Sequence, residues 1–360
     1  MISFQASVSK GWLHRNGGFL FNSRYYLDPI YRRHQEIKIN EFVKRNFGNY
    51  PVYNMEANLI QASYTNEKQV LVAGIQPNLM LAILLGAELV SYPDKDADVS
   101  GCPLKDISGS RDLPSVKTML DHPFIQELEN QILFLRRDHP ELEIIPPFFW
   151  DSSGRATIHG IITTSLKLIG ENAMIMAMTD PGFMHAVHQW ITDVYILLIT
   201  HFSRMTGFSI TSVHVGECSG TMISGEQYME FITPYVSQIG KTFGNIRLHS
   251  CGPSDHLLDA ISKIDKLSVI DTGSGTSVGK IRERMGTDFE INLEPPLQLM
   301  LKDSSISDLI AWLDQVLEEN KGGPLKLVLH IESDYSTENC LRIYDELANR
   351  KLIQIKKRIK

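Results

Sequence analysis

The chain has 360 residues, of which 43% are hydrophobic and 21% are charged. This composition is typical of a globular protein with a large buried core and excludes an intrinsically disordered chain. The 35 basic and 42 acidic side chains give a formal net charge of −7. We therefore expect no nucleic-acid partner, because phosphate binding requires a basic surface.

The first 50 residues carry eight basic side chains and three acidic ones, Asp28, Glu36 and Glu41. Organelle transit peptides are poor in acidic residues, so this segment is not expected to be one. We predict instead that residues 1–50 form a folded, helical N-terminal arm packed against the rest of the chain. Residues 51–360 are then predicted to form a single catalytic domain.

Short β-rich runs alternate with longer amphipathic segments through the rest of the chain. One amphipathic segment, Gly225–Phe243, follows a predicted N-cap at Ser224, and Asp180 is predicted to begin another helix. This alternation predicts a (β/α)8 TIM barrel, with a doubly wound parallel sheet as the alternative. The predicted strands are Pro51–Glu56, Glu88–Tyr92, Ile144–Trp150, Ser209–Gly216, Asn245–His249, Lys266–Asp271, Phe289–Leu293 and Lys326–Ile331.

No segment of the sequence is expected to cross a membrane. The two most apolar stretches, 78–90 and 194–200, are short or interrupted by charge, whereas a span needs about 20 apolar residues. The chain has only four cysteines and no recognisable signal peptide, so a disulfide framework is not expected. We therefore expect a cytoplasmic protein whose thiols are reduced and free to bind a metal.

The active site of a TIM barrel lies at the carboxyl ends of the strands. Polar side chains that could bind a metal or a substrate follow each predicted strand. They are Glu56, Asp94, Asp151, Glu217 with Cys218, His249 with Cys251, Asp271, Glu294, and His330 with Glu332.

The motif Arg247-Leu248-His249-Ser250-Cys251-Gly252 is the most specific of these sites. Residues i and i+2 of a strand face the same side, so His249 and Cys251 can reach one metal ion together. Imidazole and thiolate are preferred zinc ligands. The alternative interpretation is a small buried cysteine beside a hydrogen-bonded histidine.

The stretch from Gly220 to Leu258 resembles the uroporphyrinogen decarboxylase superfamily. The resemblance rests on Met222-Ile223-Ser224, Tyr228-Met229-Glu230-Phe231, Pro234-Tyr235 and the Leu248–Gly252 motif. The His-x-Cys-Gly pattern is similar to that of its zinc-dependent branch. This branch contains methyltransferases that move a methyl group from a corrinoid (methylcobalamin) protein to a thiol such as coenzyme M. The likeness extends over roughly residues 140–345, including Gly160–Gly170 and Asp180-Pro181.

The resemblance implies that His249 and Cys251 hold a zinc ion. The family's third ligand, a cysteine on the last strand, is replaced here by the run Leu327–Ser333, which includes His330 and Glu332. The third ligand could therefore be Cys218, His330, Glu332 or Glu217. Catalytic or substrate-binding roles are predicted for Glu217, Asp271 and Asp151, and Asp151 could equally form a structural ion pair with Arg155.

The implied activity is methyl transfer between a corrinoid on a partner protein and a zinc-activated thiol or related small-molecule acceptor. Two alternatives are a metal-independent lyase of the uroporphyrinogen decarboxylase type and a non-enzymatic barrel that binds a corrinoid or tetrapyrrole. The lyase would need cations to hold many carboxylates, and no arginine lies between Arg45 and Arg111, where that family has them. The sequence leaves the oligomeric state open.

Overall fold

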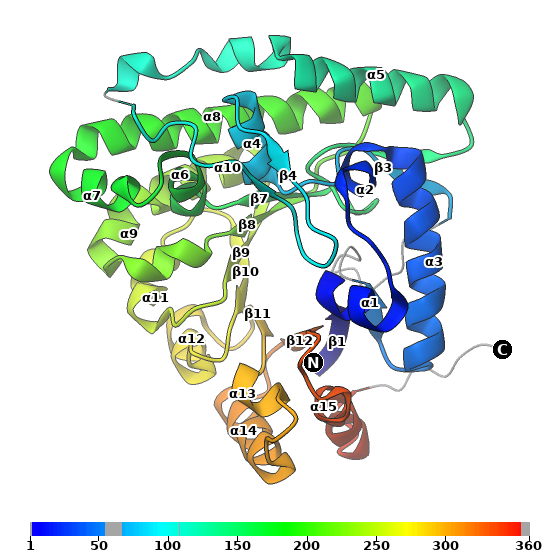
Figure 1. The fold of residues 1–360 in the computed structure, drawn as a ribbon. Helices are drawn as coiled ribbons and strands as arrows, with labels where there is room; N and C mark the ends of the chain where they lie inside the picture. Colours follow the sequence, from blue (N-terminus) through cyan, green and yellow to red (C-terminus); the bar gives the residue numbers. More distant parts are fainter. Residues whose placement is uncertain (1, 55–66, 108, 354–360) are drawn as a thin grey trace.

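A curled, eight-stranded parallel sheet forms the centre of the computed structural model, which describes residues 2–54, 67–107 and 109–353 (Figure 1). The strand order is β2-β1-β12-β11-β10-β9-β8-β7. Its strands are β1 (Ile2–Val8), β2 (Val52–Asn54), β7 (Arg155–His159), β8 (Ser212–Gly216), β9 (Asn245–Ser250), β10 (Leu267–Thr272), β11 (Glu290–Leu293) and β12 (Leu325–Ile331).

Two small sheets accompany the large one. Strand β3 (Gln69–Leu71) pairs in parallel with β6 (Glu143–Ile145), and β4 (Leu89–Val90) pairs antiparallel with β5 (Asp98–Val99). Within the described residues, the edge strands β2 and β7 of the large sheet do not pair with each other. The architecture is therefore a curled parallel α/β sheet of the TIM-barrel type, and closure into a complete (β/α)8 barrel stays a prediction.

Helices cover the outside of the sheet (Figure 1). The α-helices are α1 (Lys10–Gly17), α2 (Ser23–Leu27), α3 (Pro29–Phe47), α4 (Pro77–Leu84), α5 (Pro123–Asp138), α6 (Ile161–Ile169), α7 (Asn172–Thr179), α8 (Pro181–Thr206), α9 (Gly225–Phe231), α10 (Thr233–Phe243), α11 (Leu258–Ile261), α12 (Val278–Met285), α13 (Leu297–Met300), α14 (Ile306–Glu319) and α15 (Thr337–Asn349). Short 3-10 helices are η1 (Ser110–Asp112), η2 (Val116–Asp121), η3 (Cys218–Met222) and η4 (Asp255–Leu257).

The predicted helix starts at Ser224 and Asp180 are confirmed. The Ser224 hydroxyl accepts from the backbone N–H of Gln227, whose side chain accepts in turn from the Ser224 N–H, forming a capping box. The carboxylate of Asp180 accepts from the N–H of Phe183 at 3.0 Å and caps α8. No helix in the described part of the chain combines the length and apolar character of a membrane span.

Six of the eight predicted strands lie in the large sheet, as β2 and β8 to β12. The two predicted strands Glu88–Tyr92 and Ile144–Trp150 correspond to β4 and β6, which lie in the small sheets instead. Two strands of the large sheet, β1 and β7, were not predicted. In β1, Phe4, Ala6 and Val8 belong to the hydrophobic core, whereas Gln5 and Ser7 between them are polar and buried. Polar residues that face the inside of the sheet thus hid these strands from a search for apolar runs.

The first 50 residues were predicted to form an arm packed against the barrel. For β1, the first strand of this segment, that prediction is wrong. β1 lies inside the large sheet, between β2 and β12, and pairs with β12 from Ile2↔Leu325 to Val8↔Ile331. The helices α1 to α3 follow it and lead directly back to β2 in the same sheet. The uneven charge of this segment suggests a separate arm, but the alternating polar and apolar residues of β1 form a strand of the large sheet.

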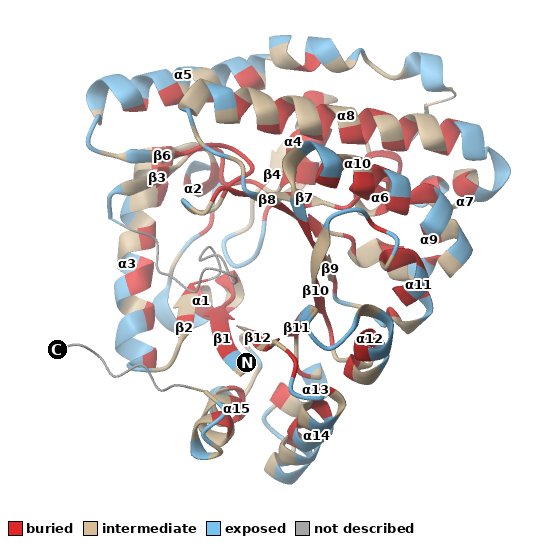
Figure 2. Cartoon of the chain, turned by 180° about the vertical axis from the view of Figure 1, so that it is seen from behind, coloured by how far each residue is buried: buried red, intermediate tan, exposed pale blue. Residues whose placement is uncertain are grey.

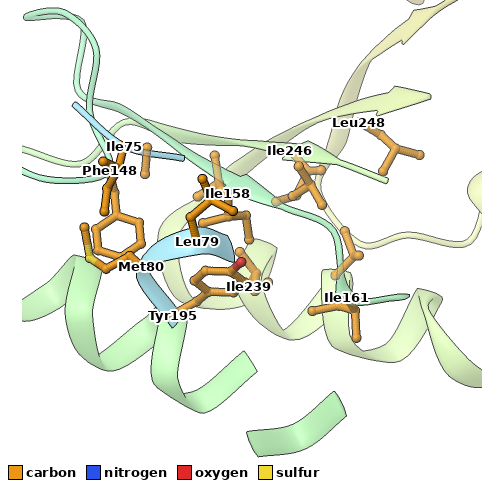
Figure 3. Packing of buried hydrophobic residues seen from close by; sticks show 14 of the residues in the cluster. Ile75, Leu79, Met80, Phe148, Ile158, Ile161, Tyr195, Ile239, Ile246 and Leu248 are labelled. Carbon is orange, nitrogen blue, oxygen red and sulfur yellow. The ribbon is translucent and has the colours of Figure 1, made fainter. Parts of the chain in front are cut away.

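The hydrophobic core fills the space between the sheet and the helices. In Figure 3, Ile246 and Leu248 of β9 and Ile158 of β7 lie on the side of the sheet that Tyr195 and Ile239 of the covering helices face. Figure 2 shows that burial runs along the strands, whereas the outer faces of the helices are exposed. Since side chains alternate along a strand, the residues between these core positions point the other way, into the barrel.

Candidate metal centre and cavity

A cavity of about 360 Å³ opens at the carboxyl ends of the strands, a volume within the usual range for small-molecule sites. It extends down into the sheet along the inward-facing residues of β7, β8 and β9. It is lined by Lys10, Tyr26, Gly74, Gln76, Pro77, Leu79, Asp96, Ala97, Trp150, Arg155, Thr157, Ile158, His159, His214, Gly216, Cys218, Arg247, His249, Asp271 and His330.

Three side chains at this edge form what we call the Cys–His–Cys cluster: Cys218, His249 and Cys251. One ligand atom of each lies within 4.8 Å of the other two. His249 is in β9, Cys251 directly follows that strand, and Cys218 begins η3 after β8. Gly216 pairs with His249 across the two strands, and this register places Cys218 beside the histidine.

The donor set and spacing of the cluster fit a zinc ion. Zinc binds thiolate sulfur at about 2.3 Å and imidazole nitrogen at about 2.0–2.1 Å in a tetrahedron, so its ligand atoms are about 3.5–3.8 Å apart. The three ligand atoms of the cluster lie within 4.8 Å of one another. Side-chain rotations that move each atom by about an ångström would bring them to the spacing of a zinc site. Three protein ligands leave the fourth position open, as in catalytic zinc sites, and Cys251 is exposed.

Asp271 fixes the orientation of the His249 ring. Its Oδ2 lies 2.9 Å from His249 Nδ1, and the same oxygen accepts from Arg247. A carboxylate can only accept, so Nδ1 donates and Nε2 is the ring nitrogen that could bind a metal. Burial opposes a charged imidazole here, but the Asp271 carboxylate outweighs it and raises the pKa of His249 well above its ordinary value.

The two thiols of the cluster titrate as a pair. The hydrogen bonds from Cys218 and His249 lower the pKa of Cys251 to about 4. The Cys251 sulfur and burial together raise the pKa of Cys218. In the metal-free state the cluster therefore holds a thiolate beside a charged imidazole. A divalent cation would take the place of the imidazole proton and supply the positive charge next to the thiolate.

Close backbone approach around the cluster depends on glycine. A Cβ at Gly273 would lie 2.1 Å from the carbonyl oxygen of Cys251, and a Cβ at Gly252 would lie 3.0 Å from the side chain of Thr221. Larger residues at Gly273 would force the end of β10 away from Cys251. The loop 271–275, which contains a G-x-G pattern, therefore has a packing role at the Cys–His–Cys cluster.

Glu217, predicted as a ligand or catalytic residue, is a fully buried helix cap. Its carboxylate accepts from the N–H groups of Ile162 and Thr163 at 3.3 and 3.0 Å and from the Thr163 hydroxyl at 2.9 Å. Burial nevertheless raises its pKa to about 7. It anchors the first turn of α6 and fixes the chain directly before Cys218.

His330, a second candidate ligand, lines the same cavity but stands apart from the cluster. Its Nδ1 is 2.8 Å from the hydroxyl of Ser7 in β1, and its Nε2 is 3.7 Å from Glu294. Burial, together with the charge on His249, lowers the pKa of His330 to about 4, so it is neutral at physiological pH. A neutral histidine on this wall is suited to contact a bound ligand.

Asp151, another predicted site residue, is not among the residues that line the cavity. Its Oδ1 accepts from the N–H of Ser153 at 2.8 Å and closes a local turn before β7. Of the other polar residues predicted after strands, Glu56 lies outside the described residues. The remaining two cysteines, Cys102 and Cys340, lie outside the cluster, and Cys340 is buried in α15.

Several polar residues that line the cavity have no role in the predictions made from the sequence. His159 of β7 and His214 of β8 line it, and burial lowers the pKa of both, that of His159 to about 4. Lys10 lines it as well and pairs with Asp96 at 2.7 Å. The signal that could have found β7 is the alternation of Arg155, Thr157 and His159 with Ala156 and Ile158.

Residues 156–329 match the family model described as uroporphyrinogen decarboxylase (URO-D). Over these residues the chain is therefore similar to the uroporphyrinogen decarboxylase family. The matched region holds β8 to β11 with most of β7 and β12, and the whole Cys–His–Cys cluster. No curated protein matches the chain.

Among solved structures, a methyltransferase from Methanosarcina mazei has a similar fold. The TM-score is 0.59 at 13% identity, over 96% of this chain and 94% of that one. A putative vitamin-B12-independent methionine synthase from Listeria monocytogenes gives 0.43 at 12% identity, over 90% and 88%. A B12-independent methionine synthase from Shewanella sp. W3-18-1 gives 0.46 at 9% identity, over 98% of both chains. The first likeness shows the fold, and the two weaker ones carry no functional conclusion.

Proposed function

We propose that this protein is a zinc-dependent methyltransferase. It moves a methyl group between a corrinoid carried by a partner protein and a small thiol, or a related acceptor, bound in the cavity. The observation that carries the proposal is the Cys–His–Cys cluster, whose ligand atoms lie within 4.8 Å of one another at the mouth of the cavity. The His-x-Cys-Gly motif, similar to that of the zinc-dependent branch, supports it.

Cys218, His249 and Cys251 would hold the metal in this proposal. A zinc ion bound there supplies the positive charge that keeps a coordinated thiol deprotonated at neutral pH. Asp271 holds the proton on Nδ1 of His249, which directs the other ring nitrogen to the metal. The exposure of Cys251 leaves this side of the cluster open for a methyl donor too large to enter the cavity.

Metal analysis of the purified full-length protein tests the proposal. We expect one zinc per chain in the wild type, and loss of zinc in Cys218→Ser and His249→Ala. Cys102→Ser is the matched control, because it removes a thiol outside the cluster. Cobalt substitution adds a second readout, since thiolate-to-cobalt absorption should weaken in Cys218→Ser and persist in Cys102→Ser. A wild-type protein that stays metal-free after expression in zinc-replete medium would overturn the proposal.

One observation favours a second candidate, a metal-independent lyase acting on a carboxylate substrate. Arg155 and Arg247 line the cavity and supply cations that the region between Arg45 and Arg111 lacks. This candidate predicts substrate turnover in the metal-free protein and no effect of Cys218→Ser. The zinc proposal predicts loss of activity in both cases.

A further inference from the structure

The described side chains that line the cavity include more permanent cations than acids. Among the described residues that line it, Lys10, Arg155 and Arg247 are permanent cations and Asp96 and Asp271 are acids. Lys10 pairs with Asp96, and Arg247 pairs with Asp271. Among these lining residues, Arg155 is the cation that forms no ion pair with a lining acid.

Arg155 is buried and lacks partners for much of its guanidinium group. The residue is 7% exposed, and its Nε and Nη1 have no hydrogen-bond partner in the described part of the chain. The charges of Asp151 and Asp271 act on Arg155 electrostatically, but the Oδ2 of Asp151 also has no hydrogen-bond partner among the described residues, so it does not bind these nitrogens. A buried guanidinium with unused donors is costly for the fold, and such a cost is typical of a site built for a ligand.

Two neighbouring side chains, Arg247 and His214, add further unused hydrogen-bond donors or acceptors beside Arg155. Arg247 and His214 pair across β9 and β8, and both line the cavity beside Arg155. Arg247 Nε and His214 Nδ1 are buried and have no hydrogen-bond partner among the described residues. Burial and the proximity of Arg247 lower the pKa of Arg155 to about 9, so the two cations are close enough to repel each other. An anion between them would relieve that repulsion.

We propose that Arg155, with Arg247 and His214 beside it, forms an anion-binding subsite on the cavity floor that takes the acid group of a small organic anion. A guanidinium presents paired N–H donors that match the oxygens of a carboxylate or sulfonate. The cavity volume of about 360 Å³ limits the ligand to a small molecule. The Cys–His–Cys cluster contributes no side chain to this subsite, so anion binding can be tested independently of the proposed function.

The depth of the subsite sets how such a ligand would lie. Arg247 precedes His249 by two residues on the same strand, which places it about 6.6–6.8 Å deeper along β9. A ligand anchored by its acid group at the floor would therefore need a chain of only a few atoms to reach the Cys–His–Cys cluster.

Calorimetric titration of the full-length protein with propionate tests the subsite, with propionamide as the neutral isostere. We expect the wild type to bind propionate and not propionamide, and Arg155→Gln to weaken propionate binding at least tenfold. Arg136→Gln, which removes an exposed arginine from α5, is the matched control and should bind like the wild type. Equal affinity of wild type and Arg155→Gln, or equal binding of acid and amide, would overturn the proposal.

Two further measurements separate this subsite from the metal site and from effects on folding. Cys218→Ser, which should lose zinc, should keep wild-type affinity for propionate, so failure of one proposal leaves the other intact. If Arg155→Gln does not fold, a crystal structure of the wild type with ethanesulfonate decides the question. The sulfonate must contact the Arg155 guanidinium, and binding elsewhere or nowhere would refute the subsite.

Discussion

Replacing Asp271 by asparagine should weaken zinc binding while preserving the shape of the site. The Oδ2 atom accepts at 2.9 Å from His249 Nδ1 and also from Arg247, and the side chain is only 5% exposed. An asparagine can turn its amide N–H₂ toward Nδ1 and favour the tautomer with the proton on Nε2, which removes the metal-binding lone pair. Loss of such an orienting partner typically lowers metal affinity about 10- to 100-fold.

The same substitution should also destabilise the fold. Arg247 is 5% exposed and would lose the charge of its partner. Leaving one member of a buried ion pair uncompensated costs about 3–5 kcal/mol. The tenfold to hundredfold loss in zinc affinity corresponds to about 1.4–2.7 kcal/mol, so the effect on stability should exceed the effect on binding.

Zinc affinity would be measured by competition with a chromophoric chelator, and stability by urea unfolding of the metal-free protein. Asp265→Asn is the matched control, because it removes an exposed carboxylate paired with Lys241 at 2.8 Å. Zinc affinity within twofold of the wild type, in an Asp271→Asn protein that keeps its far-ultraviolet circular dichroism, would refute the orienting role.

Two further predictions concern packing and pH. Gly160→Ala should cost about 1–3 kcal/mol and lower zinc content, because its Cβ would lie 2.1 Å from Glu217 Oε2 and 2.7 Å from Glu217 Cα. Urea unfolding and metal analysis check this, with Gly182→Ala, whose nearest atom is at 3.8 Å, as the control. Burial lowers the pKa of His188 to about 4, so the stability it provides is present above pH 6.5 and is lost as pH falls from 6.5 toward 4. That loss is about 3 kcal/mol at 1.36 kcal/mol per pH unit, and His188→Gln should reduce it in unfolding curves at pH 7.5 and 4.5, whereas exposed His34→Gln should not.

Some of the predicted strands are mostly apolar runs. Strands β11 and β12 are of this kind, with runs such as Leu327-Val328-Leu329. Strand β7, in which Arg155, Thr157 and His159 alternate with core residues, was not predicted. A strand that lines a polar cavity carries polar residues at alternate positions, which weakens its hydrophobic signal. Strands β8 and β9 also face the cavity and were nevertheless predicted, so this effect hides some of the strands near the site and not all of them.

The proposed metal ligands show the same division between local and distant information. The i, i+2 spacing of His249 and Cys251 is local, and the structure brings both to one point. The sequence left the third ligand open among several residues on other strands. The choice of Cys218 over His330 depends on the Gly216↔His249 register and on the curl of the sheet, which place β12 and its histidine on another part of the cavity wall. Neither property can be read from one sequence without an alignment.

The alternation of β9 connects the stability of the fold to the chemistry of the site. Ile246 and Leu248 face the helices in the hydrophobic core, while Arg247 and His249 face the cavity from the positions between them. A shift of one residue in register would place both charged side chains in the core and both aliphatic ones at the metal centre. The buried ion pair between Arg247 and Asp271 opposes such a shift, because it forms only when the β9 and β10 residues that face inward are the polar ones. We therefore expect substitutions of Arg247 to disturb the pairing of β9 with β10 as well as the orientation of His249, and backbone amide exchange along β10 would report this even in the metal-free protein.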